Sequence, residues 1–294
     1  MDWIQALNSV AACLHGAQAI VVISLIAWLD SRPQAQGPFA NNGQFPLQRF
    51  APVWTAAGES HLQAVDAGVF DVRSAILAFF VLSCAAHSVA AVFFEGRLGA
   101  VLHYAEYALS ASVALCAIAV EAGIRDVYTL QAQFVLTFAT MVLGMAGEFT
   151  QTPQRPVFPC ALFHVAGWVT CLAAYAPIMD VYLQSADLSA LKPPSFVSAL
   201  VFVEFALFAC FGFTQTYALV ARAAAYATPP SDSMYSLDAS SSSHDNDEWL
   251  PSSSSSYDAR ALRAVEEHAE LAFIVLSLTA KTTLCWIVLS PLLV

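Results

Sequence analysis

Long apolar stretches separated by short polar breaks dominate the pattern of this chain. A helix needs about 20 apolar residues to cross a bilayer. Seven stretches meet this length: residues 6–29, 69–94, 99–121, 127–149, 157–183, 194–226 and 262–292. Most connections are short, which makes consecutive helices antiparallel. The pattern predicts an all-α membrane protein in which residues 1–294 form a single seven-helix transmembrane bundle.

Two connections in this pattern are long. Residues 30–68 mix four prolines with aromatic residues, so we expect an ordered loop, with a small β-hairpin as one form of it. Residues 228–258 contain serine runs and acids, which is typical of a disordered segment. We expect a solvated spacer there, and phosphorylation of its serines is the alternative.

Composition supports the membrane prediction. Hydrophobic residues make up 58% of the chain and charged residues 11%, against about 25% charged residues in soluble domains. The first stretch follows Met1, Asp2 and Trp3 without a basic segment, and no clear cleavage site follows it, so we expect a retained helix. All seven cysteines fall within predicted spans, where they are most simply packing residues.

Charge places limits on partners and leaves orientation open. The net charge is −11, but much of the acid lies in residues 232–258, and no basic patch indicates a nucleic-acid partner. The positive-inside rule needs an asymmetry. The loop cations divide evenly: Arg97, Arg155, Arg222, Arg260 and Arg263 on the N-terminal side, and Arg32, Arg49, Arg73, Arg125 and Lys192 on the other.

Lys281 lies in the middle of the last apolar stretch, LAFIVLSLTAKTTLCWIVLSPLLV. A cation at the centre of a bilayer costs about 2.5–3.5 kcal/mol on insertion scales. A lysine can also lose its charge or form a Schiff base, which an arginine does not do. The position therefore predicts a functional residue with a buried partner.

Glu106 is the leading partner, because it lies well inside the stretch VLHYAEYALSASVALCAIAV. His103 and Ser110 share its helical face at i−3 and i+4, and Ser277 lies four residues before Lys281. Charge pairing alone leaves two interpretations open, a functional site and a structural salt bridge. Buried ion pairs seldom increase stability on balance, which favours function.

Two histidines, His15 and His87, lie within the first and second spans. Either one alone is most simply a hydrogen-bonded core residue. Two histidines in adjacent helices suggest a hydrated polar pocket. Gln18 lies one turn after His15 and could extend this pocket. Histidine is a natural proton acceptor near neutral pH.

Glu204 is a second intramembrane acid, in the stretch SFVSALVFVEFALFACF. It is either a neutral carboxylic acid or a proton carrier. We expect Glu148 to reach the membrane interface. The aromatic residues of the fifth and sixth spans most simply serve packing or lipid contact, and the alternative is that they line a cavity for a flat ligand. We find no group of residues in the sequence that is typical of a metal site or of a hydrolase active site. We therefore predict that the protein is not an enzyme.

Several short sequence motifs resemble those of the heliorhodopsins, which are relatives of the microbial-type retinal proteins. Residues 106–113 read EYALSASV and residues 277–281 read SLTAK, with Ser277 where ion-pumping rhodopsins carry an aspartate. LHGAQ around His15 and LSCAAH before His87 are similar to the family's two pocket histidines, and PSFVSALVF opens the sixth span. The resemblance covers all seven spans, and the specific words lie mainly in the first, second, third and last.

The resemblance implies all-trans retinal bound to Lys281 as a protonated Schiff base, with Glu106 as counterion. It implies that Ser277 and Ser110 lie near the Schiff base and that His15 and His87 lie in an adjoining cavity. It also implies a cytoplasmic N-terminus and a homodimer to which residues 30–68 contribute.

Two departures bear on function. The family usually carries a basic residue, mostly arginine, where this chain has His103, and Glu204 stands at an expected apolar position. The main hypothesis is a light sensor that signals to an unknown cytoplasmic partner. The first alternative is a light-activated proton conductor with Glu106, Glu204 and His103 on its path. The second is a retinal-free membrane transporter or receptor with a structural Lys–Glu pair.

Overall fold

The computed structural model describes residues 3–31, 43–54, 60–93, 97–187, 193–227 and 259–290. Within these ranges the chain forms seven helices and two strands. They are α1 (Trp3–Asp30), β1 (Gln44–Trp54), β2 (Ser60–Asp71), α2 (Val72–Phe93), α3 (Arg97–Glu121), α4 (Val127–Thr150), α5 (Cys160–Asp187), α6 (Ser195–Ala227) and α7 (Ala259–Leu289). The seven helices are long and apolar enough to cross a membrane, which confirms the predicted bundle.

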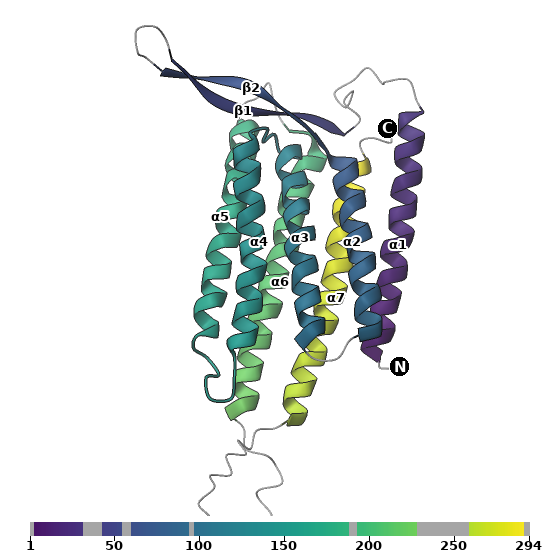
Figure 1. Ribbon diagram of the computed structural model, residues 1–294, viewed down its shortest axis with the longest axis vertical. Coiled ribbons are helices and arrows are strands. Elements are labelled where there is room, and N and C mark those ends of the chain that lie inside the picture. Colours follow the sequence, from purple (N-terminus) through teal and green to yellow (C-terminus); the bar gives the residue numbers. More distant parts are fainter. Residues whose placement is uncertain are drawn as a thin grey trace, which may run out of the picture.

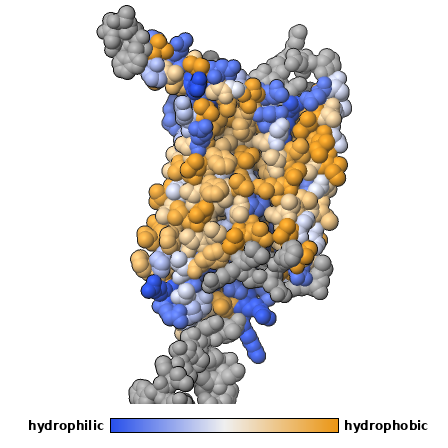
Figure 2. Space-filling model, in the orientation of Figure 1, coloured by the Kyte–Doolittle hydropathy of each residue, from blue (hydrophilic) through white to orange (hydrophobic). Residues whose placement is uncertain are grey.

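Sequence neighbours pack side by side in the bundle, and α7 lies against both α6 and α1 (Figure 1). The end where α1 begins is called the N-terminal face, and the end that carries the strands is called the hairpin face. Figure 2 shows an apolar belt over the middle of the bundle and hydrophilic residues towards both ends. Side chains such as Ile20, Val135 and Val220 point outwards, as expected for residues that face lipid.

The helix ends differ from the predicted spans by a few residues. α5 runs from Cys160 to Asp187 instead of over residues 157–183, and α7 begins at Ala259 and ends at Leu289 instead of running over 262–292. Hydropathy marks the membrane-embedded part of a helix, and the helix itself continues into polar residues such as Ser185 of α5. The serine-rich segment 228–258 lies outside the described residues.

The connection between α1 and α2 contains the antiparallel hairpin of β1 and β2, so a β-hairpin is the form that this loop takes. Leu47 pairs with Gly68 and Gln48 with Asp66, so one extra residue forms a bulge. Gly68 adopts a φ of 103°, and its N–H donates to the Asp66 carboxylate at 2.9 Å. β2 continues to Asp71, three residues beyond the predicted loop.

The hairpin is fixed to the turn between α3 and α4. The N–H of Gln48 donates to the carbonyl of Arg125 at 2.9 Å, and the Arg125 guanidinium lies 4.5 Å from the centroid of the Phe45 ring. Asp126 then caps α4 by accepting from the N–H of Thr129 at 2.8 Å. The strands therefore lie across the ends of the helices, as Figure 1 shows.

The two halves of the bundle interior differ in polarity. The half near the hairpin face holds a continuous apolar core that includes Phe79, Phe80, Leu115, Leu200 and Leu284. Most of the buried polar side chains lie in the other half or near mid-depth. The polar set includes Asn8, His15, Ser83, His87, His103, Glu106, Gln215 and Arg222. The buried polar groups are therefore concentrated towards the N-terminal face.

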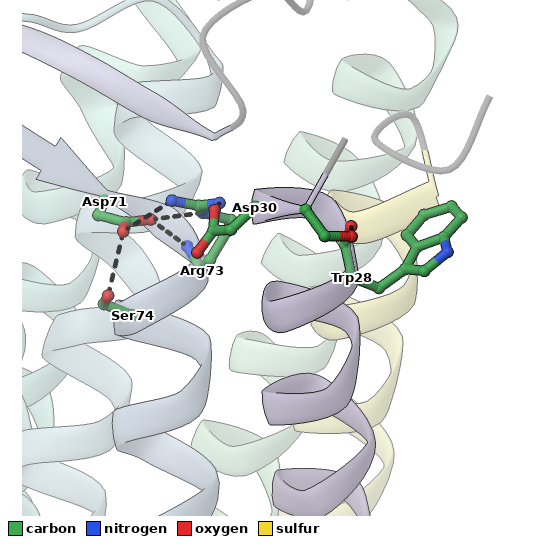
Figure 3. A network of polar contacts seen from close by, with 6 residues as sticks. Trp28, Asp30, Asp71, Arg73 and Ser74 are labelled. Atoms are coloured by element: carbon green, nitrogen blue, oxygen red, sulfur yellow. Dashed lines mark hydrogen bonds and ion pairs between the residues drawn. The ribbon is translucent and has the colours of Figure 1, made fainter. Parts of the chain in front are cut away.

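A buried arginine joins α1, α2 and the hairpin (Figure 3). The Arg73 guanidinium donates to Asp30 at 2.8 Å and to Asp71 at 3.2 Å, and the Ser74 hydroxyl donates to Asp71 at 3.1 Å. Arg73 is 3% exposed, so it is not the loop residue that the sequence suggested. Burial alone would raise the pKa of Asp71, but the hydrogen bonds and charge of Arg73 lower it below its ordinary value.

This network predicts a pH-dependent contribution to stability. Because the folded pKa of Asp71 is lowered, its contribution is complete above the unfolded value of about 3.9 and is lost as pH falls through the folded value. Asp71→Asn should therefore lower the melting temperature in detergent at pH 6, and the difference from wild type should shrink below about pH 4. Asp180→Asn, at an exposed carboxylate of α5, is the control. A difference that is constant with pH would contradict the account.

Candidate functional site

Lys281 meets Glu106 inside the bundle. Its ammonium donates to Glu106 Oε1 at 2.5 Å, to Ser83 Oγ at 2.6 Å and to Ser277 Oγ at 2.9 Å. Ser83 in turn donates to the same Glu106 oxygen at 2.7 Å. Lys281 is 8% exposed and Glu106 is 3% exposed. The three ammonium hydrogens therefore have acceptors, as a buried cation requires.

Helical periodicity explains this convergence. Ser277 lies one turn before Lys281 on α7, and Ser83 lies one turn before His87 on α2, so each hydroxyl shares a face with an ionisable group. Sequence reasoning missed Ser83, although its spacing from His87 would have pointed to it. Ser110 is buried and lines a small cavity beside Lys281, without bonding to the ammonium itself.

A cavity of about 790 Å³ runs from the N-terminal face into the bundle between α3, α4, α5, α6 and α7. A smaller cavity of about 40 Å³ lies at Lys281. Tyr107, Met141, Phe208 and Phe211 line both, so the large cavity leads towards the lysine. The aromatic residues of α5 and α6 therefore divide: Trp168, Phe208 and Phe211 line the cavity, whereas Phe202 and Phe213 are exposed on the outer surface.

Trp168 forms one wall of the cavity and rests on Gly212. A Cβ atom at Gly212 would lie 2.4 Å from the indole ring, so no larger residue fits there without a shift. The indole N–H donates to His164 at 3.1 Å, and that imidazole contacts Thr216 at 2.8 Å. The indole ring of Trp168 is thus held by its packing on Gly212 and by its hydrogen bond to His164.

We expect Gly212→Ala to move Trp168 into the cavity, with a cost of about 1–3 kcal/mol for overpacking. The melting temperature should fall, and any absorption band formed with retinal should shift or form in lower yield. Gly167→Ala is the control, because a Cβ there would meet its nearest atom at an ordinary 3.6 Å. Equal behaviour of the two variants would show that the Trp168–Gly212 contact does not shape the cavity.

The two predicted pocket histidines lie against each other. The rings of His15 and His87 are stacked with centroids 5.5 Å apart, and both residues are almost fully buried. Neither ring nitrogen of His15 has a hydrogen-bond partner among the described residues. Gln18 donates instead to Thr282 at 2.6 Å, next to Lys281. Buried polar atoms of this kind usually bind water, which agrees with a hydrated pocket.

His103 lies on the N-terminal side of Glu106 and contacts Glu270. Its Nδ1 is 2.9 Å from Glu270 Oε1, and the centroid of its ring is 5.7 Å from that of His87. Sequence reasoning missed Glu270, which lies 11 residues before Lys281 on a similar face of α7. Its place near the polar start of that helix made it resemble an ordinary surface acid.

Glu204 is 1% exposed and lines the small cavity together with Lys281. Its Oε1 has no hydrogen-bond partner among the described residues. It lies at the border of the apolar core, one turn from Leu200 on α6. The structure therefore brings it close to the lysine without joining it to the Glu106 cluster.

Glu148 differs from the expectation of an interfacial residue. It accepts from the Tyr104 hydroxyl at 2.8 Å and from Arg222 at 2.9 Å inside the large cavity, and the Arg222 side chain is 9% exposed. Arg222 therefore belongs to the interior of α6 and not to a loop. In the sequence, Glu148 and Arg222 lie near the ends of their helices. Nothing in the sequence indicated that Glu148 would bind Tyr104 of α3 and Arg222 of α6.

The fold and this site define a class of protein. Seven membrane-spanning helices enclose a lysine–carboxylate pair, and the small cavity at the lysine shares aromatic walls with a larger cavity. This arrangement is that of a retinal-type rhodopsin.

A comparison with protein families gives the narrower assignment. A family model described as heliorhodopsin matches residues 4–227, which is more than half of the chain, so the protein belongs to the heliorhodopsin family. The match ends with α6, so Lys281 on α7 lies beyond it. A search of curated proteins found no match.

Family membership implies a retinal chromophore, and the site fits one. Retinal is a long, flat and mostly apolar molecule with a reactive carbonyl at one end. Met141, Trp168, Phe208 and Phe211 offer apolar walls, and a primary amine lines the small cavity that shares three of these residues with the large one. Among the described residues we find no cluster that could hold a metal ion.

Proposed function

We propose that the protein is a light sensor in which all-trans retinal is bound to Lys281 as a protonated Schiff base, with Glu106 as the counterion. The contact of 2.5 Å between Lys281 Nζ and Glu106 carries this proposal, because it places a carboxylate against the reactive amine at the end of the cavity. A cation delocalised over retinal needs this compensation in a low-dielectric interior.

The residues around Lys281 hold the proton in the dark. Glu106 supplies the negative charge, and Ser83 and Ser277 provide hydroxyl oxygens within hydrogen-bond distance of Nζ. Retinal, when bound, supplies an isomerisation driven by light, which changes the direction of the N–H bond. Glu106 and the serines then no longer match that direction, and the proton at Nζ is free to leave.

His15 and His87 are the proton acceptors in this scheme. The stacked pair is buried, has unbonded ring nitrogens and lies on the side of the bundle that contains the other polar groups. The apolar core blocks the opposite direction. A proton that leaves and returns on the same side gives a signalling cycle without net transport, which favours the sensor over a conductor.

Absorption spectroscopy tests this function. Adding all-trans retinal to membranes that contain the protein should produce a visible band, and a flash of light should replace it transiently with a band at shorter wavelength. If no visible band forms, the sensor and the conductor are both wrong, and the retinal-free transporter or receptor is the remaining account.

A light-activated proton conductor is the second candidate, and Glu204 is the observation that favours it. A buried carboxyl that lines the cavity at Lys281 is suited to carry a proton towards the hairpin face. We expect no sustained photocurrent in cells that express the wild type. If a photocurrent exists and Glu204→Gln abolishes it, the conductor is correct; a current unchanged in that variant rules out the path through Glu204.

The proposal extends to assembly and orientation. The hairpin exposes Phe50, Leu62 and Val69, with Leu62 at 70% exposure, which suits a contribution to a homodimer. Membership of the family further suggests that the N-terminal face is cytoplasmic. A signalling partner would meet the polar mouth of the large cavity there. Cross-linking in native membranes should give a dimer through hairpin cysteines introduced at Leu62, and an exclusively monomeric product would contradict this part.

A further inference from the structure

His103 and Glu270 lie between the histidine pair and the large cavity. Both residues line the cavity, and the cavity extends to Arg263 and Glu266, which are exposed at the start of α7. His103 also contacts the histidine pair through His87, with ring centroids 5.7 Å apart. The same two residues therefore face the buried pair on one side and the N-terminal face on the other.

The hydrogen bonds around His87 indicate which of its ring nitrogens carries the hydrogen and which can accept a proton. The Asn8 amide N–H donates to the carbonyl of Ile4 at 3.2 Å, which turns its oxygen towards His87 Nδ1 at 2.8 Å. His87 Nδ1 must then carry the hydrogen. Its Nε2, buried and without a hydrogen-bond partner among the described residues, is the basic atom that can accept a proton.

We propose that His103 and Glu270 relay a proton between the His15–His87 pair and the water of the N-terminal cavity. The inference rests on the proposed function, since light must first release the proton at Lys281. It also gives a role to the departure from the family pattern. An arginine at position 103 would not give up a proton, whereas an imidazole can accept one at one nitrogen and release one from the other.

Every proton in this transfer has a donor and an acceptor, and water is the only other reactant that the transfer needs. The proton accepted at His87 Nε2 passes to His103 through a bridging water, because His87 Nε2 has no direct hydrogen-bond partner among the described residues. His103 releases its Nδ1 proton to the Glu270 carboxylate, 2.9 Å away. Glu270 releases a proton to cavity water and so regains its charge. The return transfer runs through the same atoms in reverse.

Other charged groups face this relay from the surrounding helices. Glu266, Glu267 and Arg263 of α7 line the same cavity mouth, together with Arg222 of α6 and Glu148 of α4, which bind each other. On the inner side, Glu106 of α3 and Lys281 of α7 form their own pair. Among the described residues, Glu270 is the carboxylate that contacts His103 in an ion pair.

The test uses the retinal-loaded protein in nanodiscs with a pH-indicating dye in the solvent. The wild type should show a transient light-induced proton release with a visible band in place. Glu270→Gln should slow this release by roughly a hundredfold, and Glu270→Asp should restore most of it. Glu267→Gln, in the same cavity, should leave it unchanged.

His103→Arg separates the relay from a structural role. Arginine keeps a charge opposite Glu270 but does not release a proton, so the melting temperature should be kept while the dye signal is lost. In the retinal-free protein, ¹⁵N NMR should show that Glu270→Gln changes the titration of His103 and leaves His15 and His87 nearly unchanged.

The outcomes are distinguishable. A wild-type dye signal that persists unchanged in Glu270→Gln and His103→Arg would overturn the relay while the proposed function stands. So would a visible band and a full photocycle with no proton release at all. Failure to form any visible band would instead refute the proposed function, and the relay with it.

Discussion

Lys281→Ala will abolish the visible absorption band that forms when all-trans retinal is added. The side chain supplies the amine in the small cavity that adjoins the large one, and alanine offers no nitrogen for the bond. The substitution also leaves Glu106 as a buried charge without its partner, at a cost of about 3–5 kcal/mol. Absorption spectra of purified protein, taken before and after retinal addition, measure the effect.

Two further variants keep this prediction free of folding artefacts. Lys281→Arg retains a positive charge beside Glu106, but its guanidinium does not form the bond, so it should fold and remain colourless. The chain contains one other lysine, Lys192, and Lys192→Ala should form the pigment normally. A visible band in Lys281→Arg would show that the chromophore does not depend on the lysine.

Glu106→Gln will have the second largest effect, on the pH range in which the pigment is coloured. Removing the carboxylate leaves the positive charge at Lys281 without its counterion, and breaking a buried pair costs about 3–5 kcal/mol. One pH unit corresponds to about 1.36 kcal/mol, so the midpoint pH at which the visible band disappears should fall by roughly two to four units.

A titration of the visible band in detergent measures this midpoint. Glu106→Asp is the matched control, because it keeps the charge on a shorter side chain and should shift the midpoint less. Ser277→Ala removes a hydroxyl and no charge, so its effect should be smaller than that of Glu106→Gln. A Glu106→Gln midpoint equal to that of the wild type would assign the counterion to another group, with Glu204 the next carboxyl to replace.

The bundle and its central pair were accessible from the sequence for a physical reason. Apolar length dictates a membrane helix, and a cation and an acid at mid-membrane require partners. Lys281 and Glu106 stood out in this way, and the spacing of four residues placed Ser277 beside the lysine. The hairpin was expected only as one form of the loop, because its bulge depends on Gly68 and on docking at Arg125.

Residues whose importance depends on another helix were harder to predict. Glu270 resembles any acid near a helix start, and only its contact with His103 of α3 distinguishes it. Gly212 is one glycine among 12, and its role depends on the Trp168 ring packed against it. Glu148 was expected at the interface and Arg222 in a loop, because hydropathy does not report the cavity between their helices.

The unequal halves of the interior connect the site to its proposed use. Among the described residues, apolar packing fills the hairpin side, and the large cavity opens towards the N-terminal side, where most buried polar groups lie. His103 and Glu270 line that cavity, and Glu204 lies at the border of the apolar core. Signalling with proton movement on one side follows from this arrangement more directly than transport across the membrane.

Chemical trapping tests the central claim most directly. The pigment formed with all-trans retinal is treated with borohydride, which reduces the bond between retinal and an amine to a stable link, and its peptides are analysed by mass spectrometry. The account predicts a retinyl group on the peptide that contains Lys281. A retinyl group on Lys192 or on the terminal amine, or a coloured protein with no retinyl peptide, would contradict it.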